Sequence, residues 1–287
     1  MFLDKAIASD FRGRYREIVS DPLNLLIRRV PNAGFVVDGH VVMHNGLLMP
    51  LSGDLAYYKQ FSDILVINRG VHEPLEEFCF QSLLDSMKVN GPVMLELGAY
   101  WGHYSSWFKC ICPDSRVILV EPDENNFMSG CYTFNKNALQ GEFIRDFVGK
   151  DSFTVDKFLV RSSIDKLDLL HADIQGYELE MLDGASKSLH NGSISYVMVS
   201  THSERLHSDV LLFLERCHYR IEVSSSFEWH STSYDGFIFA SHVNAKRVFT
   251  DLMPLGRVEI AKATPSRLVD YVSQLKKAIR HTSSEIS

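Results

Sequence analysis

The sequence predicts an α/β protein with a Rossmann-like sheet, and three observations carry this prediction. A buried strand at residues 93–97 runs into a turn framed by Gly98 and Gly102, and apolar residues at helical spacing follow it. A second apolar strand, 116–120, ends in an acid roughly 20 residues after the glycine turn. Strand-like and helical runs alternate along the rest of the chain, which is typical of a sheet with helices on both faces.

The glycine turn differs from a phosphate-binding loop. Tyr100 occupies the place of the second glycine in G-x-G-x-x-G, and the chain contains no G-x-x-x-x-G-K-[ST]. The turn is E-x-G-x-x-x-G, with Glu96 at the strand end, where a carboxylate suits a cationic ligand end such as an ammonium near a sulfonium. The pattern indicates S-adenosylmethionine, bound by Glu96, Gly98, Ala99, Tyr100 and Gly102. An incidental surface glutamate beside a glycine turn is the alternative.

The acids after the next two strands complete the predicted cofactor site. Glu121, followed by Pro122, is placed to accept hydrogen bonds from both ribose hydroxyls. Asp123 directly precedes a helical pattern, so it suits a helix cap better than a ligand. Asp146 lies near the end of a third strand candidate, 142–149, where adenine contacts fall in such folds, although a turn acid is an equal interpretation.

The segment before the sheet is predicted to be an N-terminal extension, residues 1–70. Apolar spacing in residues 1–30 predicts two short helices that form a lid or an interface. From residue 35 to 68, short β-rich runs alternate with Asp-Gly and Asn-Gly turns and end in the run 64–67, which predicts a small β element.

The cofactor-binding core is expected at residues 71–245 and a helical tail at 246–287, where Thr264-Pro265 begins an amphipathic helix. A serine-rich segment with Trp229 and His230 joins the last two predicted strands, 219–223 and 236–240. We expect this segment over the cleft or at a subunit contact, because the core sheet does not need it.

Three side chains are candidates for the acceptor side of the site. Asp173 ends the strand predicted at 167–173 and His202 follows the strand at 194–200, and because these strands are neighbours in a doubly wound sheet, both side chains should face one cleft. His202 has the better intrinsic pKa for a general base, and His171, on the same strand face as Asp173, is the reserve.

Asp173 would orient the acceptor or the methionine end of the cofactor, or ligate a divalent metal. The metal is not favoured, because oxygen-binding cations usually need more than one carboxylate. The alternative is that Asp173 caps the helix predicted from Gln175 and that His202 is an ordinary strand-end histidine.

Composition excludes several classes of protein. The net charge is −7 and the pI is about 5.9. Lys and Arg are scattered, so the basic stripe that nucleic acid needs is missing. No apolar stretch approaches the length of a membrane span. The five cysteines are odd in number and include no C-x-x-C pair, which favours reduced thiols and a cytoplasmic protein.

Taken together, the motifs resemble those of the FkbM-type S-adenosylmethionine-dependent methyltransferases. The resemblance covers about residues 65–205 and is carried by RGVHE at 69–73, LELGAYWGHYS at 95–105, VEP at 120–122 and ADIQGYE at 172–178. It implies a seven-stranded class I methyltransferase sheet and, usually, O-methylation. The chain departs from the family at two positions: His171 replaces a common Lys, and Ser200-Thr201-His202 replaces a common Glu-x-His.

The leading hypothesis is therefore an enzyme that transfers a methyl group from S-adenosylmethionine to a hydroxyl of a small molecule or sugar, with homo-oligomerisation left open. An S-adenosylmethionine-binding regulatory protein without catalysis is one alternative. A nicotinamide-dependent oxidoreductase is the other, and Tyr100 in the glycine turn argues against it.

Overall fold

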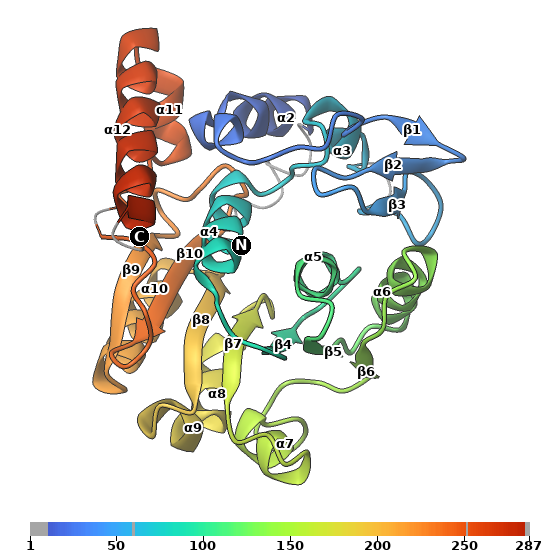
Figure 1. The fold of residues 1–287 in the computed structure, drawn as a ribbon, viewed down its shortest axis with the longest axis vertical. Helices are drawn as coiled ribbons and strands as arrows, with labels where there is room; N and C mark the ends of the chain where they lie inside the picture. The colour runs from blue at the N-terminus through green and yellow to red at the C-terminus, as the bar shows by residue number, and fades with distance from the viewer. Residues whose placement is uncertain (1–10, 59–60, 251, 285–287) are drawn as a thin grey trace.

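The protein is built around a seven-stranded sheet with the strand order β6-β5-β4-β7-β8-β10-β9 (Figure 1). The computed structural model describes residues 11–58, 61–250 and 252–284. Strand β10 runs antiparallel to β8 and β9, and the other neighbours pair in parallel. The predicted seven-stranded Rossmann-like sheet is confirmed. Its strands are β4 (Val93–Leu97), β5 (Arg116–Val120), β6 (Glu142–Ile144), β7 (Leu167–Ala172), β8 (Ile194–Thr201), β9 (Tyr219–Ser225) and β10 (Gly236–His242).

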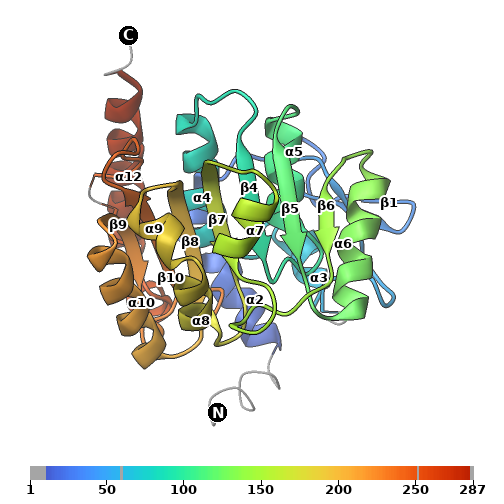
Figure 2. The ribbon, with the colours of Figure 1, turned by 90° about the horizontal axis from the view of Figure 1, so that it is seen from below.

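Helices cover both faces of the sheet (Figures 1 and 2). Because successive side chains of a strand point to opposite faces, Met94 joins one apolar cluster and Leu95 the other. The Met94 cluster includes side chains of α4 (Pro74–Ser86), α5 (His103–Ile111) and α6 (Glu124–Lys136). The Leu95 cluster includes side chains of α7 (Val155–Arg161), α8 (Glu178–Gly184), α9 (Ser186–His190) and α10 (Glu204–Arg216).

The N-terminal extension contains the predicted small β element, a three-stranded antiparallel sheet. The predicted strand at 64–67 is wrong: these residues belong to helix α3, which buries Ile64 and Leu65. A short continuous apolar run without alternation fits a buried helix as well as a strand. Residues 1–10 of the first predicted helix lie outside the described residues. The elements are α2 (Phe11–Ser20), the 3-10 helix η1 (Pro22–Leu25), β1 (Val36–Val37), β2 (His40–Val42), β3 (Leu48–Pro50) and α3 (Asp63–Ile67).

The C-terminal tail folds into α11 (Arg257–Lys262) and α12 (Pro265–Ser284), the latter beginning at the predicted proline. Leu23 of η1 and Leu275 of α12 join the same apolar cluster as the sheet. Extension, core and tail therefore share one interior, and the boundaries at 70 and 245 stay predictions. Among the described residues, no helix combines the length and the apolar character that crossing a membrane requires.

Candidate cofactor and acceptor site

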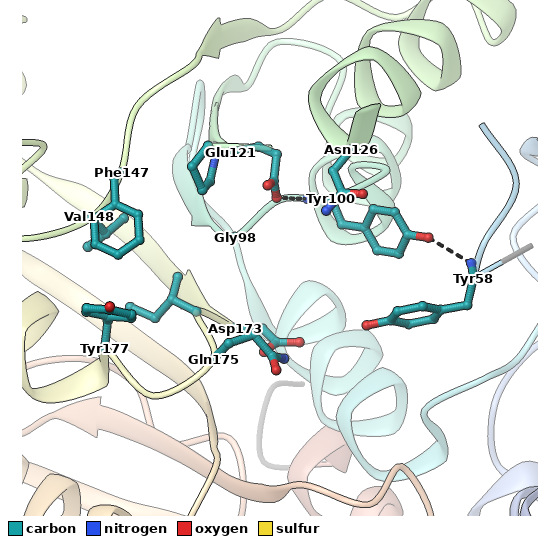
Figure 3. Close-up of a pocket in the computed structure, with 12 residues that line it drawn as sticks. Tyr58, Gly98, Tyr100, Glu121, Asn126, Phe147, Val148, Asp173, Gln175 and Tyr177 are labelled. Carbon is teal, nitrogen blue, oxygen red and sulfur yellow. Dashed lines mark hydrogen bonds between the residues drawn. The ribbon is translucent and has the colours of Figure 1, made fainter. Parts of the chain in front are cut away.

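A cavity of about 230 Å³ opens at the carboxyl ends of β4, β5 and β7 (Figure 3). This is the edge of an open α/β sheet where ligands bind. It includes predicted cofactor ligands from three separate motifs. Its lining residues are Tyr58, Gly98, Tyr100, Glu121, Pro122, Asn126, Phe147, Val148, Asp173, Ile174, Gln175 and Tyr177.

Gly98 is required by the backbone of the neighbouring strand. Its φ is +72°, and a Cβ atom there would lie 1.8 Å from the carbonyl oxygen of Asp173. Gly102 also has a positive φ, +71°, but a Cβ there would meet Leu119, and the residue does not line the cavity. Of the two predicted turn glycines, Gly98 is at the site, whereas Gly102 allows α5 to start against β5.

Glu121 is buried and held by the backbone. One carboxylate oxygen accepts the N–H of Tyr100 at 2.9 Å, and the other accepts the N–H of Asp123 at 2.9 Å. Burial raises the pKa of this carboxyl, and these N–H donors oppose the rise. A carboxylate has about four acceptor positions; the two N–H groups and the side chain of Asn126 use three of them, which leaves one for a ribose hydroxyl of a ligand. The predicted cap is also present, since Asp123 accepts two N–H groups of α6.

The far end of the cavity is apolar and aromatic. The rings of Phe147 and Tyr177 meet edge to face with centroids 4.6 Å apart, and Val148 lines the cavity beside them. Asp146 does not line the cavity; its carboxylate accepts the N–H of Phe147. Its adenine role stays a prediction, whereas Phe147 lies outside every motif and Tyr177, although part of the motif at 172–178, is not singled out by that motif as a ligand.

A second, smaller cavity of about 50 Å³ continues from the first. Both are lined by Tyr58, Gly98, Tyr100 and Asp173. Glu73, Glu96 and Asp173 bring three carboxyl groups to the smaller cavity, which makes it suitable for a cationic ligand end. Its other lining residues are Tyr57, His72, Ala99, Trp101, His103, Tyr104 and His171.

Glu96 is 2% exposed and accepts the N–H of Ser105 at 3.0 Å. Burial raises its pKa to about 8, and a ligand cation nearby would draw it back to the charged form. Glu73 accepts the hydroxyl hydrogen of Tyr104 at 2.7 Å. Both carboxyl groups are thus fixed in place at the wall of the smaller cavity.

The structure brings Asp173 and His202 together, as the strand order requires. Nε2 of His202 lies 3.2 Å from Asp173 and 3.7 Å from Asp235, and its Nδ1 lies 2.7 Å from Glu178. Burial would lower the pKa of His202, but the bonds to Asp173 and Glu178 outweigh it and raise the pKa to about 11. An imidazole that is already protonated cannot accept a proton, so this geometry argues against His202 as the base.

The other acceptor-side interpretations change as well. Helix α8 begins at Glu178 with Tyr177 as its N-cap and no side-chain cap bond, so the alternative role of Asp173 as a cap is wrong. His171 packs against Tyr104 with ring centroids 4.3 Å apart, and burial lowers its pKa to about 4. It is a neutral and weak reserve base.

The sequence interpretation missed Asp235, which precedes β10 at the end of the serine-rich segment. Burial raises its pKa to about 7, and the charge of Asp173 adds to the rise. In the same segment, Ser233 donates to Glu76 at 3.1 Å, and Thr232 donates to Asp21 at 2.8 Å. The segment thus joins the N-terminal extension to the acceptor side, and Trp229 remains 60% exposed.

The sheet order, the glycine turn and the acid at the end of β5 define a class I, S-adenosylmethionine-dependent methyltransferase. Residues 73–221 match the family model of the methyltransferase FkbM domain, over more than half of the chain. The protein belongs to this family, and the resemblance found in the motifs is confirmed.

Solved structures align with the chain only weakly. A precorrin-6y C5,15-methyltransferase from Geobacter metallireducens is 13% identical, with 56% of this chain and 86% of that chain covered and a TM-score of 0.42. TrmK of M. capricolum, in complex with S-adenosyl-homocysteine, is 13% identical, with 69% and 82% covered and a TM-score of 0.42. Similarity this low carries no argument about substrate. A search of curated proteins finds no match.

The residues present fit S-adenosylmethionine. Glu121 has a free acceptor position for a ribose hydroxyl, and the aromatic end of the larger cavity suits an adenine. The buried carboxyl groups of Glu96 and Glu73 suit the charged methionine end. Asp173 lines both cavities and therefore lies where the nucleoside and methionine parts would meet.

Proposed function

We propose that the protein methylates a hydroxyl oxygen of a small molecule or sugar. The observation that carries the proposal is the pair of carboxyl groups that meet at His202: Asp173 lines both cavities, and Asp235 reaches the same histidine. Carboxylates accept hydrogen bonds from hydroxyl groups and can take up the proton that a hydroxyl loses on methylation.

Bound S-adenosylmethionine supplies an electrophilic methyl group, so the chain has only to align the acceptor oxygen and remove its proton. We assign proton removal to Asp235. With a pKa of about 7, raised first by burial and then by Asp173, this carboxyl is partly ionised at neutral pH and matched to a base role. Asp173 would accept a hydrogen bond from the acceptor, and His202 is a positioning residue that holds both acids.

The same charges favour a small neutral acceptor over nucleic acid. The chain has a net charge of −7, and the carboxyl groups at the cleft would repel a phosphate backbone. All five cysteines are free thiols, which is compatible with the cytoplasmic location that we propose. Homo-oligomerisation stays a prediction.

Transfer of labelled methyl from S-adenosylmethionine into a metabolite extract, followed by mass identification of the product, tests the proposal. We expect a methyl ether in the small-molecule fraction, and roughly 10²-fold slower formation of it with Asp173→Asn. Label in the RNA or protein fraction would refute the acceptor class. Calorimetry with S-adenosylmethionine, S-adenosylhomocysteine and the nicotinamide dinucleotides is the control for binding. Cofactor binding without product in any fraction would indicate a regulatory protein.

A further inference from the structure

A cluster of buried histidines surrounds a buried carboxylate behind the smaller cavity. His44 lies in the turn between β2 and β3, Glu77 on α4, and His103 at the first position of α5. Their side chains are at most 4% exposed. One ligand-type atom from each of the three lies within 4.8 Å of the others. Three segments distant in the sequence thus bring metal-binding atoms to one point.

These atoms lack hydrogen-bond partners. Nε2 of His44, Nε2 of His103 and Oε2 of Glu77 are all buried and without a hydrogen bond among the described residues. His44 Nε2 and Glu77 Oε2 form an ion pair at 3.1 Å whose angles fall outside hydrogen-bond geometry, and His103 Nε2 lies 3.9 Å from Glu77 Oε1. The other oxygen, Oε1, accepts the N–H groups of His72 and Glu73 at 2.8 and 3.1 Å. Buried polar atoms are rarely left without a hydrogen bond, so His103 Nε2 beside this ion pair leaves room for a further partner at the same place.

The surrounding backbone and rings fix the cluster. Gly70 has a φ of +82°, and a Cβ atom there would lie 2.1 Å from the backbone nitrogen of His44. The glycine therefore lets the turn with His44 approach α4. The ring of His44 packs on Trp107 at 4.4 Å between centroids, and that of His103 stacks on Trp101 at 4.9 Å. Rings held in this way are preorganised as ligands.

We propose that this cluster binds one zinc(II) ion through Nε2 of His44, Nε2 of His103 and Oε2 of Glu77. Imidazole nitrogens with a carboxylate suit zinc, whereas calcium and magnesium take oxygen ligands. Ligand atoms around tetrahedral zinc are about 3.4 Å apart, so small side-chain movements would close these three on an ion. His72 is a candidate fourth ligand, because its Nδ1 also lacks a hydrogen bond and lies 2.8 Å from Glu77 Oε1.

The ion would act on the fold of the cofactor site and not on the acceptor. It joins the N-terminal extension to α4 and to the start of α5, directly after the glycine turn. His103 lines the smaller cavity, so losing the ion would loosen the wall around the methionine end of the cofactor. Asp173 also lines that cavity, but neither Asp173 nor its neighbours His202 and Asp235 are ligands of the proposed ion.

Metal content of the full-length protein, purified without chelator, is the direct test. Elemental analysis should find one zinc per chain in the wild type. Glu77→Gln, His44→Gln and His103→Gln should lose most of it. His190→Gln, an exposed histidine on the other face of the sheet, is the matched control and should keep it. Replacement by cobalt(II) should give the visible absorption of a low-symmetry site in the wild type and in His190→Gln only.

A second measurement uses only the wild type, so it does not depend on whether the variants fold. After removal of metal by chelator, zinc at about 100-fold above its dissociation constant should raise Tm by about 5 °C or more, and magnesium should not. If wild type carries no more zinc than Glu77→Gln and zinc leaves Tm unchanged, the cluster is an ion-paired network without metal. Neither measurement needs the methyl acceptor, so the result is independent of the proposed O-methylation.

Discussion

The two halves of the site satisfy their carboxyl groups in different ways. On the cofactor side, Glu121 is held by two backbone N–H groups from its own and the preceding turn. On the acceptor side, Asp173 and Asp235 share one side chain, His202, which follows another strand. Local backbone fixes the first half and tertiary contacts fix the second. Substitutions that disturb the backbone should therefore damage the cofactor half most, and substitutions that change a side-chain charge should damage the acceptor half most.

The largest effect is expected from Gly98→Val. The new Cβ would fall 1.8 Å from the Asp173 carbonyl oxygen, and φ is +72°, so strain and collision combine to cost about 4 kcal/mol of unfolding free energy or more. Gly53→Val is the matched control: φ is +90° with nothing within 4 Å of the new Cβ, so about 1–2 kcal/mol is expected. Urea unfolding measures both. Equal losses would show that the strand contact at Gly98 is unimportant.

The same contrast explains how far the sequence could predict the site. The cofactor half is formed by contiguous sequence motifs, which is why it could be predicted: Gly98, Glu121 and Pro122 all line the cavity. The acceptor half depends on which segments fold together. Asp235 lies in a segment without a motif. The charge of His202 is set by acids from two separate segments, Asp173 and Glu178 in one turn and Asp235 in the other, which its intrinsic pKa does not reveal.

Asp173→Asn should give the next largest effect. Asparagine keeps one acceptor oxygen but loses the negative charge that binds the substrate hydroxyl and pairs with His202, so kcat should fall by roughly 10²-fold, the usual contribution of acid–base groups. Single-turnover methyl transfer measures this, and calorimetry should show a much smaller change in cofactor affinity. A loss confined to cofactor binding would place Asp173 in the cofactor half alone.

Glu121→Ala should weaken S-adenosylmethionine by roughly 1.5–3 kcal/mol, the worth of hydrogen bonds to a charged group. The rate with saturating cofactor should stay close to that of the wild type, because Glu121 does not contact the acceptor-side acids. Glu121→Gln, which keeps the shape and one acceptor oxygen, should lose less. A dissociation constant within about threefold of wild type for Glu121→Ala would contradict the ribose assignment.

The smallest effect, a shift of a pH profile, separates Asp235 from His202 as the base. The pKa of Asp235 is raised to about 7 by burial and by Asp173, while the charge of His202 opposes the rise. A base must be deprotonated, so the wild-type rate should climb with pH through about 7 and then level off. His202→Gln removes the opposing positive charge, which should move this acid limb to higher pH by about one unit, with His190→Gln unchanged.

The stability of the fold gives an independent check. The folded-state pKa of His202 is raised to about 11, so its contribution is complete below the unfolded-state pKa near 6.5 and is lost as pH rises toward 11. The wild type should lose its stability advantage over His202→Gln across that window. If His202→Gln abolishes the acid limb instead of moving it, the histidine is the base and the assignment to Asp235 is wrong.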